Sequence, residues 1–99
     1  MSHAARRLLI KGRVQGVGYR AWVDHEARRL GLQGWVRNRR DGNVEAVFAG
    51  DERIVADMIS ACRNGPPSSR VDEVEEETAH EDALGLRRPG EAFSVLPTI

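Results

Sequence analysis

The chain has 99 residues and a mass of 11.0 kDa, and 40% of its residues are hydrophobic while 30% are charged. This length suits one domain over residues 1–99, with a core over about residues 6–97 and a flexible tail at residues 1–5. No apolar run approaches the roughly 20 residues that cross a bilayer, and the N-terminal residues lack the apolar stretch of a signal peptide. The sequence therefore predicts neither a membrane protein nor a secreted mini-protein.

The charges are distributed unevenly along a chain whose formal net charge is zero. Residues 1–50 contain ten Lys or Arg against four Asp or Glu, whereas residues 51–99 contain five against eleven. The first half therefore suits an anion site, while the whole chain has no broad basic field. Cys62 is the only cysteine, so no internal disulfide can form, and we expect a cytoplasmic location with Cys62 as a small buried residue.

The chain begins its regular structure with a predicted strand over residues 7–11, whose apolar run suits a central position in a sheet. Three glycines between residues 12 and 18 then indicate a loop. From Tyr19 to Leu30, apolar residues recur at helical spacing, and Gly31 stands where a helix C-cap belongs. These patterns predict a strand, a loop and an amphipathic helix in succession.

A hairpin is predicted after this helix. Its first strand covers residues 34–39, and the alternation along it places Val36 and Asn38 on the same face. The dipeptide at residues 41–42, Asp-Gly, favours a tight turn between two strands. Residues 44–49 form the second strand of the predicted hairpin.

The second half of the chain predicts another helix and two further strands. Asp51 is a suitable N-cap, apolar residues then repeat every four positions, and the Gly-Pro-Pro run at residues 65–67 ends the helix. Residues 70–78 contain a strand whose run of glutamates is expected at a solvated edge or face. Residues 80–90 read as a loop, and residues 93–96 suit a short last strand.

The predicted order is strand, helix, strand, strand, helix, strand. This is the split βαβ pattern of an α+β, ferredoxin-like sandwich, in which two helices cover one face of an antiparallel sheet. Because this fold hosts many unrelated functions, the function must be argued from the residues of a site.

The most informative segment covers residues 12–20, Gly-Arg-Val-Gln-Gly-Val-Gly-Tyr-Arg, and joins the first strand to the start of the first helix. Consecutive backbone N–H groups in such a loop can converge on one anion, and the helix dipole adds partial positive charge. Arg20 in the first helical turn can add a bidentate contact to the same oxyanion. The alternative reading is a glycine-rich turn with a surface arginine. A Walker loop is excluded, because the Gly-Lys-Ser/Thr ending is absent.

This segment closely resembles the signature loop of the acylphosphatases. A second motif of that family appears in residues 31–38 and 41–45, and residues 65–74 are similar to the family's link between the second helix and the fourth strand. The resemblance covers about residues 7–78. Two departures are visible: Tyr19 stands where the family usually has Phe, and the chain lacks the aromatic residue that many members carry near the C-terminus.

The resemblance implies a stand-alone hydrolase that cleaves the mixed anhydride of a carboxylic acid and phosphate, without a cofactor or a metal. It implies that the phosphoryl group is bound by the backbone of a phosphate-binding loop formed by Gln15, Gly16, Val17, Gly18, Tyr19 and Arg20. Arg20 also contributes its guanidinium, and Asn38 orients the attacking water, so that Arg20 and Asn38 are the implied catalytic residues.

Two other functions stay open. An RNA-recognition module shares the topology but uses aromatic-rich strands and a basic surface, whereas the middle strands here offer only Trp35 and Phe48. A second alternative is an accessory domain that binds an acyl or carbamoyl phosphate for a larger maturation enzyme. Such domains precede zinc-binding segments, whereas this chain has one cysteine and no histidine pair at ligand spacing. We therefore expect a monomer that acts on a small acyl phosphate and binds neither nucleic acid nor a membrane.

Overall fold

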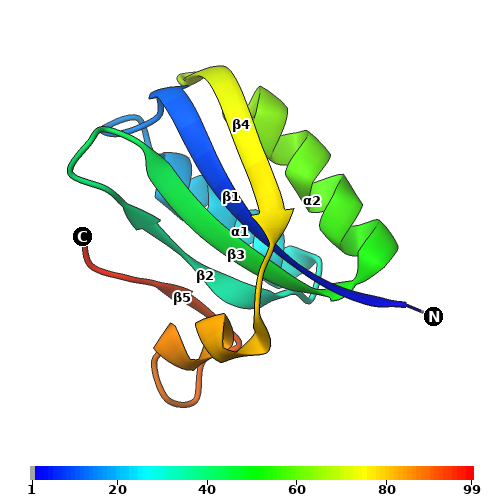
Figure 1. The fold of residues 1–99 in the computed structure, drawn as a ribbon. Helices are drawn as coiled ribbons and strands as arrows, with labels where there is room; N and C mark the ends of the chain where they lie inside the picture. The colour runs from blue at the N-terminus through cyan, green and yellow to red at the C-terminus, as the bar shows by residue number, and fades with distance from the viewer. Residues whose placement is uncertain (1) are drawn as a thin grey trace.

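A computed structural model describes residues 2–99 of the chain (Figure 1). Its elements are β1 (His3–Arg13), α1 (Tyr19–Arg29), β2 (Gln33–Asn38), β3 (Val44–Asp51), α2 (Glu52–Asn64), β4 (Arg70–Thr78), the 3-10 helix η1 (Glu81–Leu86) and β5 (Phe93–Val95). Within these residues, the strands form one five-stranded sheet in the order β4-β1-β3-β2-β5. The predicted α+β fold is confirmed.

The sheet is mixed rather than purely antiparallel. β1 pairs antiparallel with β3 and β4, and β2 pairs antiparallel with β3, as the split βαβ pattern predicts. β5 instead pairs parallel with β2. The difference arises because the chain leaves β4 at one edge, passes through η1 and enters the opposite edge in the same direction as β2 (Figure 1).

β1 is longer than the predicted strand of residues 7–11 and begins at His3. Ala4 and Ala5, which were expected in a tail, pair with Gly50 and Ala49 of β3. The pairing extends this far because β3 continues to Asp51 and offers backbone partners along its whole length. The central position of β1, between β3 and β4, agrees with its apolar run.

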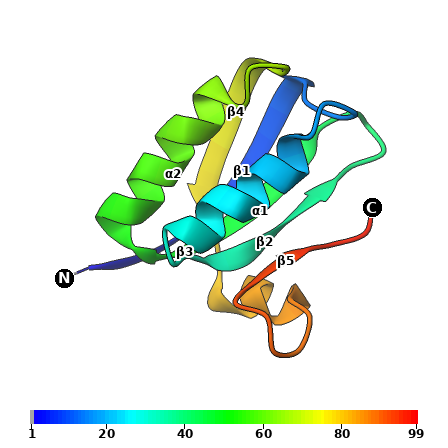
Figure 2. The ribbon, with the colours of Figure 1, turned by 180° about the vertical axis from the view of Figure 1, so that it is seen from behind.

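Both α-helices cover one face of the sheet (Figure 2). α1 buries Tyr19, Val23 and Ala27, and α2 buries Val55, Met58, Ile59 and Cys62, so the predicted apolar stripes face the core. Asp51 caps α2 as predicted, because its carboxylate accepts hydrogen bonds from the Arg53 and Ile54 amides. Among the described residues, no helix combines the length and hydrophobicity that crossing a membrane requires.

The opposite face of the sheet is covered in part by η1, which lies in the segment predicted as a loop. Trp35 is buried there with Val47 and Leu96, and its indole N–H donates a 2.8 Å hydrogen bond to the Ala83 carbonyl. The indole of Trp35 projects from the face opposite the helices, so η1 supplies the apolar and hydrogen-bonding partners that this side chain needs.

Buried Glu45 organises the charges on this second face. Its carboxylate pairs with Arg7 at 2.6 Å and Arg37 at 2.8 Å, and lies 3.5 Å from Arg39. Burial opposes ionisation of Glu45, but the hydrogen bonds from Arg37 and Arg7 outweigh it and lower the pKa of the carboxyl. Glu45 and Arg37, the charged residues that the second sequence motif contributes here, thus join the β2–β3 hairpin to β1 through Arg7.

Candidate active site

The loop between β1 and α1 presents unpaired backbone donors. The N–H groups of residues 15–18 donate no hydrogen bond to any acceptor within residues 2–99. Gly16 and Gly18 have φ values of 74° and 80°, a left-handed conformation that residues with a side chain rarely adopt. Gly18 is also the N-cap of α1, so the loop amides and the positive end of the helix dipole lie at the same place. This arrangement suits an anion.

Side-chain hydrogen bonds fix this loop on two sides. The Gln15 amide nitrogen donates to the Arg39 carbonyl at 2.7 Å and to the Asn43 carbonyl at 2.8 Å, which ties the loop to the β2–β3 turn. Both views of the fold show the loop beside this turn (Figure 1 and Figure 2). On the other side, the Ser68 hydroxyl donates to the Val17 carbonyl at 2.8 Å.

Arg20 and Asn38 reach the same cavity from different elements. Arg20 is the second residue of α1, is half-buried, and forms no ion pair with a carboxylate of the described residues. Asn38 is the last residue of β2 and is only 9% exposed. Its side-chain oxygen Oδ1 is buried and has no hydrogen-bond partner within residues 2–99. A buried polar atom without a partner is costly, and such atoms are commonly found where a ligand or substrate binds.

The cavity measures about 360 Å³. It is lined by Val14, Gly16, Gly18, Tyr19, Arg20, Ala21, Asp24, Asn38 and Val95. The structure therefore brings together most of the residues that the sequence singled out. Gln15 and Val17 do not line the cavity, since Gln15 is directed at the hairpin turn and Val17 packs against the core.

Tyr19 has its side chain in the core rather than in the cavity space. Its ring is 1% exposed, and its hydroxyl donates a 2.6 Å hydrogen bond to the Cys62 carbonyl of α2. Burial raises the pKa of this phenol well above its usual value. Tyr19 thus keeps the apolar packing of a Phe and adds a hydrogen bond between the two helices.

Four residues of the cavity wall were not among the predicted site residues: Val14, Ala21, Asp24 and Val95. Asp24 stands four residues after Arg20, a spacing that places both on one face of a helix, so the sequence contained a signal for it. Val95 lies on β5, whose parallel placement beside β2 the sequence did not indicate.

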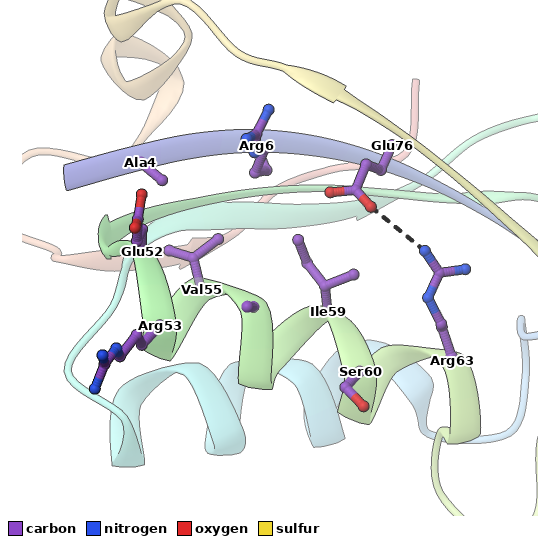
Figure 3. A pocket seen from close by; sticks show the side chains of 10 residues that line it. Ala4, Arg6, Glu52, Arg53, Val55, Ile59, Ser60, Arg63 and Glu76 are labelled. Carbon is purple, nitrogen blue, oxygen red and sulfur yellow. Dashed lines mark hydrogen bonds and ion pairs between the residues drawn. The ribbon is translucent and has the colours of Figure 1, made fainter. Parts of the chain in front are cut away.

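A second hollow of about 490 Å³ lies between α2 and the β1–β4 edge of the sheet (Figure 3). Val55 and Ile59 point into it, and Arg63 and Glu76 form a 3.4 Å ion pair across it. Its lining includes no residue of the loop at 12–20 and, among residues 2–99, no buried side-chain polar atom without a hydrogen-bond partner. Within the described part of the chain, no group of three or more His, Cys, Asp or Glu could hold a metal ion in either hollow.

The chain matches the family model described as Acylphosphatase over residues 6–85. It belongs to the acylphosphatase family. A 99-residue alignment with the Acylphosphatase of Bradyrhizobium diazoefficiens shows 66% identity and covers all of both chains. Members of this family are enzymes, and the resemblance seen in the sequence motifs is confirmed.

Solved structures of other acylphosphatases share the fold. The acylphosphatase from Bacillus subtilis is 35% identical, with a TM-score of 0.79, over 93% of this chain and 97% of its own. Full-length HypF, solved in a phosphate- and nucleotide-bound form, is 27% identical with a TM-score of 0.80. That match covers 98% of this chain but only 12% of the HypF chain. An acylphosphatase fold therefore occurs both as a whole chain and as a small part of a larger one.

Proposed function

We propose that this acylphosphatase hydrolyses acyl phosphates to a carboxylate and inorganic phosphate. Its phosphate-binding loop is formed by the backbone of residues 15–20, its charge partner is the Arg20 guanidinium, and its water-orienting group is the Asn38 amide. The observation that carries the proposal is the shared cavity. Among the described residues, it brings together loop amides without an acceptor, an arginine without a carboxylate partner and a buried amide oxygen without a hydrogen-bond partner.

Binding of the phosphoryl group follows from the charges of this cavity. The loop N–H groups, the N-terminus of α1 and Arg20 all present positive charge or partial charge toward the same space. Phosphoryl transfer proceeds mainly by positioning and by stabilisation of charge on the equatorial oxygens. Fixed amide donors supply that stabilisation without reorganising during the reaction.

Hydrolysis then needs a water in line with the bond that breaks. The Asn38 oxygen accepts a hydrogen bond from this water and thereby directs a lone pair of the water oxygen toward phosphorus. As the new P–O bond forms, the bond from phosphorus to the bridging oxygen breaks and its electron pair leaves on the carboxylate. An amide is not a base at neutral pH, so we assign the water proton to a phosphoryl oxygen, giving dihydrogen phosphate. A carboxylate is a good leaving group and needs no general acid.

The test is hydrolysis of benzoyl phosphate by the wild-type chain and by Arg20→Ala. The proposal expects turnover by the wild type and a loss of kcat/KM of at least about 1,000-fold in the variant, the lower end of what an arginine contributes to the transition state of phosphoryl transfer. A wild-type chain that binds inorganic phosphate but does not turn over benzoyl phosphate would support the accessory-domain alternative instead.

The proposal also takes the chain to act as a monomer in the cytoplasm, without nucleic acid. Its single cysteine is buried, which removes the simplest route to a covalent dimer. Size-exclusion chromatography with light scattering should give a mass near 11.0 kDa. Filter binding with single-stranded RNA at two salt concentrations should show no retention.

A further inference from the structure

The loop between β1 and α1 is held by a serine from the loop that joins α2 to β4. The Ser68 hydroxyl donates a 2.8 Å hydrogen bond to the Val17 carbonyl. Within residues 2–99, no backbone N–H donates to that carbonyl, so Ser68 is its hydrogen-bond partner in the described part of the chain. Gly18 lines the cavity, whereas neither Val17 nor Ser68 does.

This hydrogen bond fixes the orientation of one peptide group. The Val17 carbonyl and the Gly18 N–H belong to the same trans peptide, in which the two groups point in opposite directions. Because the carbonyl is directed at Ser68, outside the cavity lining, the Gly18 N–H is directed away from Ser68. That N–H has no acceptor among residues 2–99 and is available to an anion.

The glycine at position 18 is the reason why this peptide needs a restraint. A flip of the peptide changes mainly the ψ of Val17 and the φ of Gly18. Gly18 has a φ of 80°, and glycine populates positive and negative φ about equally, so its own sterics do not exclude the flipped orientation. In that orientation the carbonyl would replace the N–H as the group that faces the cavity, and its partial negative charge would repel phosphoryl oxygens.

The loop that carries Ser68 is itself fixed. Ser69 donates its amide and its hydroxyl to the Pro66 carbonyl, at 3.0 Å and 2.7 Å, which closes a tight turn. Gly65 packs against the first residue of α1, since a Cβ on Gly65 would lie 2.9 Å from the Tyr19 ring. The next strand, β4, then pairs with the last residues of β1, directly before the phosphate-binding loop. The Ser68 hydroxyl is therefore presented from a fixed position.

We propose that Ser68 is a positioning residue for the phosphate site. Its hydroxyl holds the Val17 carbonyl and thereby keeps the Gly18 N–H directed at the phosphoryl group, while Ser68 itself does not touch the substrate. This inference rests on the proposed function, because it assigns the orientation of one donor of the same loop. It requires only that the loop binds phosphate, so it can be tested without turnover.

The experiment is a titration of the nitrogen-15-labelled chain with inorganic phosphate, followed by NMR. The shift of the Gly18 backbone amide reports binding at this peptide and gives the Kd. Ser68→Ala removes the hydroxyl and Ser68→Thr retains one. Ser69→Ala is the matched control, because it removes a neighbouring hydroxyl that bonds to Pro66 rather than to the phosphate-binding loop. Urea unfolding of each variant separates a loss of affinity from a loss of stability.

We expect Ser68→Ala to raise the Kd for inorganic phosphate about 3- to 10-fold, the factor that corresponds to the net contribution of one hydrogen bond. The kcat/KM for benzoyl phosphate should fall by at least the same factor, while urea unfolding of Ser68→Ala matches that of Ser69→Ala. Ser68→Thr, which keeps the donor, and Ser69→Ala should both stay within about 2-fold of the wild-type Kd.

An unchanged Kd in Ser68→Ala would overturn the inference. Equal losses of affinity in Ser68→Ala and Ser69→Ala would overturn it too, because the affinity would then depend on the α2–β4 loop as a whole. In both cases turnover of benzoyl phosphate by the wild type leaves the proposed function intact. A wild type that binds phosphate without turnover would contradict the proposed hydrolysis, and the Kd values would still decide the role of Ser68. A wild type that binds no phosphate would contradict both.

Discussion

Arg20 supplies the cationic side chain among the described residues that line the cavity. We predict that Arg20→Lys lowers kcat/KM for benzoyl phosphate by at least about 100-fold, because an ammonium cannot reproduce the two-point contact of a guanidinium with phosphoryl oxygens. Steady-state kinetics measure this. Arg53→Lys, an exposed position on α2, is the control and should stay within about 2-fold of the wild type. An Arg20→Lys enzyme with wild-type turnover would refute the bidentate role.

Asn38 should affect rate more than binding. We predict that Asn38→Ala lowers kcat by about 1,000-fold or more, while inhibition by inorganic phosphate stays within a few-fold, because the amide positions water and adds no charge. Asn38→Asp should weaken phosphate binding as well, since a carboxylate repels phosphoryl oxygens. Circular dichroism checks folding, and Asn64→Ala on the exposed end of α2 serves as the control. Normal turnover with lost phosphate affinity would make Asn38 a binding residue instead.

Burial raises the pKa of the Cys62 thiol to about 12. In the unfolded chain the thiol ionises at about pH 8.5, so the unfolded state loses this proton first and the free energy of unfolding falls as the pH rises above that value. We predict that between pH 8 and pH 10 the wild type loses about 2 kcal/mol more stability than Cys62→Ala. Urea unfolding at both pH values measures this. Rapid reaction of the native thiol with Ellman's reagent at pH 8 would contradict the burial.

Individual residues differ in how far the sequence reveals them. Arg20 could be singled out from its place in the first helical turn after a glycine-rich loop, whereas Asn38 was implied only by the family resemblance; the structure places both at one cavity. Asp24 stands four residues after Arg20, a spacing that places both on one face of a helix. An acidic residue is nevertheless not expected beside a site for a negatively charged phosphoryl group. The ion pair of Asp24 with Arg28 explains why it is tolerated there.

The Gln15 side chain joins the loop between β1 and α1 to the β2–β3 turn through two hydrogen bonds. We predict that Gln15→Ala lowers kcat about 10-fold and the free energy of unfolding by about 1–2 kcal/mol, because two side-chain hydrogen bonds are lost and the distance from the loop to Asn38 is no longer fixed. The two carbonyls each keep one backbone N–H donor. Kinetics and urea unfolding measure the two effects. Gln33→Ala, exposed at the start of β2, is the control. Full activity in a destabilised Gln15→Ala would show that the contact serves the fold alone.

Most helices and strands could be predicted because their patterns are local. The stripe of α2, the Asp51 cap and the turn at residues 41–42 need only neighbouring residues to be read. The start of β1 and the presence of η1 could not be predicted from the sequence, because each depends on residues far away in the chain. Residues 3–5 are strand only where β3 runs alongside them, and η1 packs where Trp35 needs cover.

The complete site joins elements that are far apart in the sequence, and none of them has a cluster of metal ligands within residues 2–99. In the proposed function, loop amides, the α1 dipole and Arg20 together provide the positive potential that phosphoryl transfer requires. We predict that exhaustive treatment with EDTA leaves kcat/KM for benzoyl phosphate within about 2-fold of the untreated enzyme, since the amides and Arg20 carry this role. The check is an assay before and after treatment. A large loss that magnesium restores would contradict this account of the electrostatics.

The sheet separates the chain's two tryptophans into different optical environments. Trp22 of α1 lies 5.5 Å from the Tyr19 ring on the helical side, whereas Trp35 is enclosed under η1 on the other face with Arg37 4.6 Å from its ring centre. Two variants, one that retains only Trp22 and one that retains only Trp35, would therefore report fluorescence from opposite layers of the molecule. Comparing their unfolding curves would tell whether η1 detaches before the helical layer that includes α1 and Arg20 unfolds, or whether both layers unfold together.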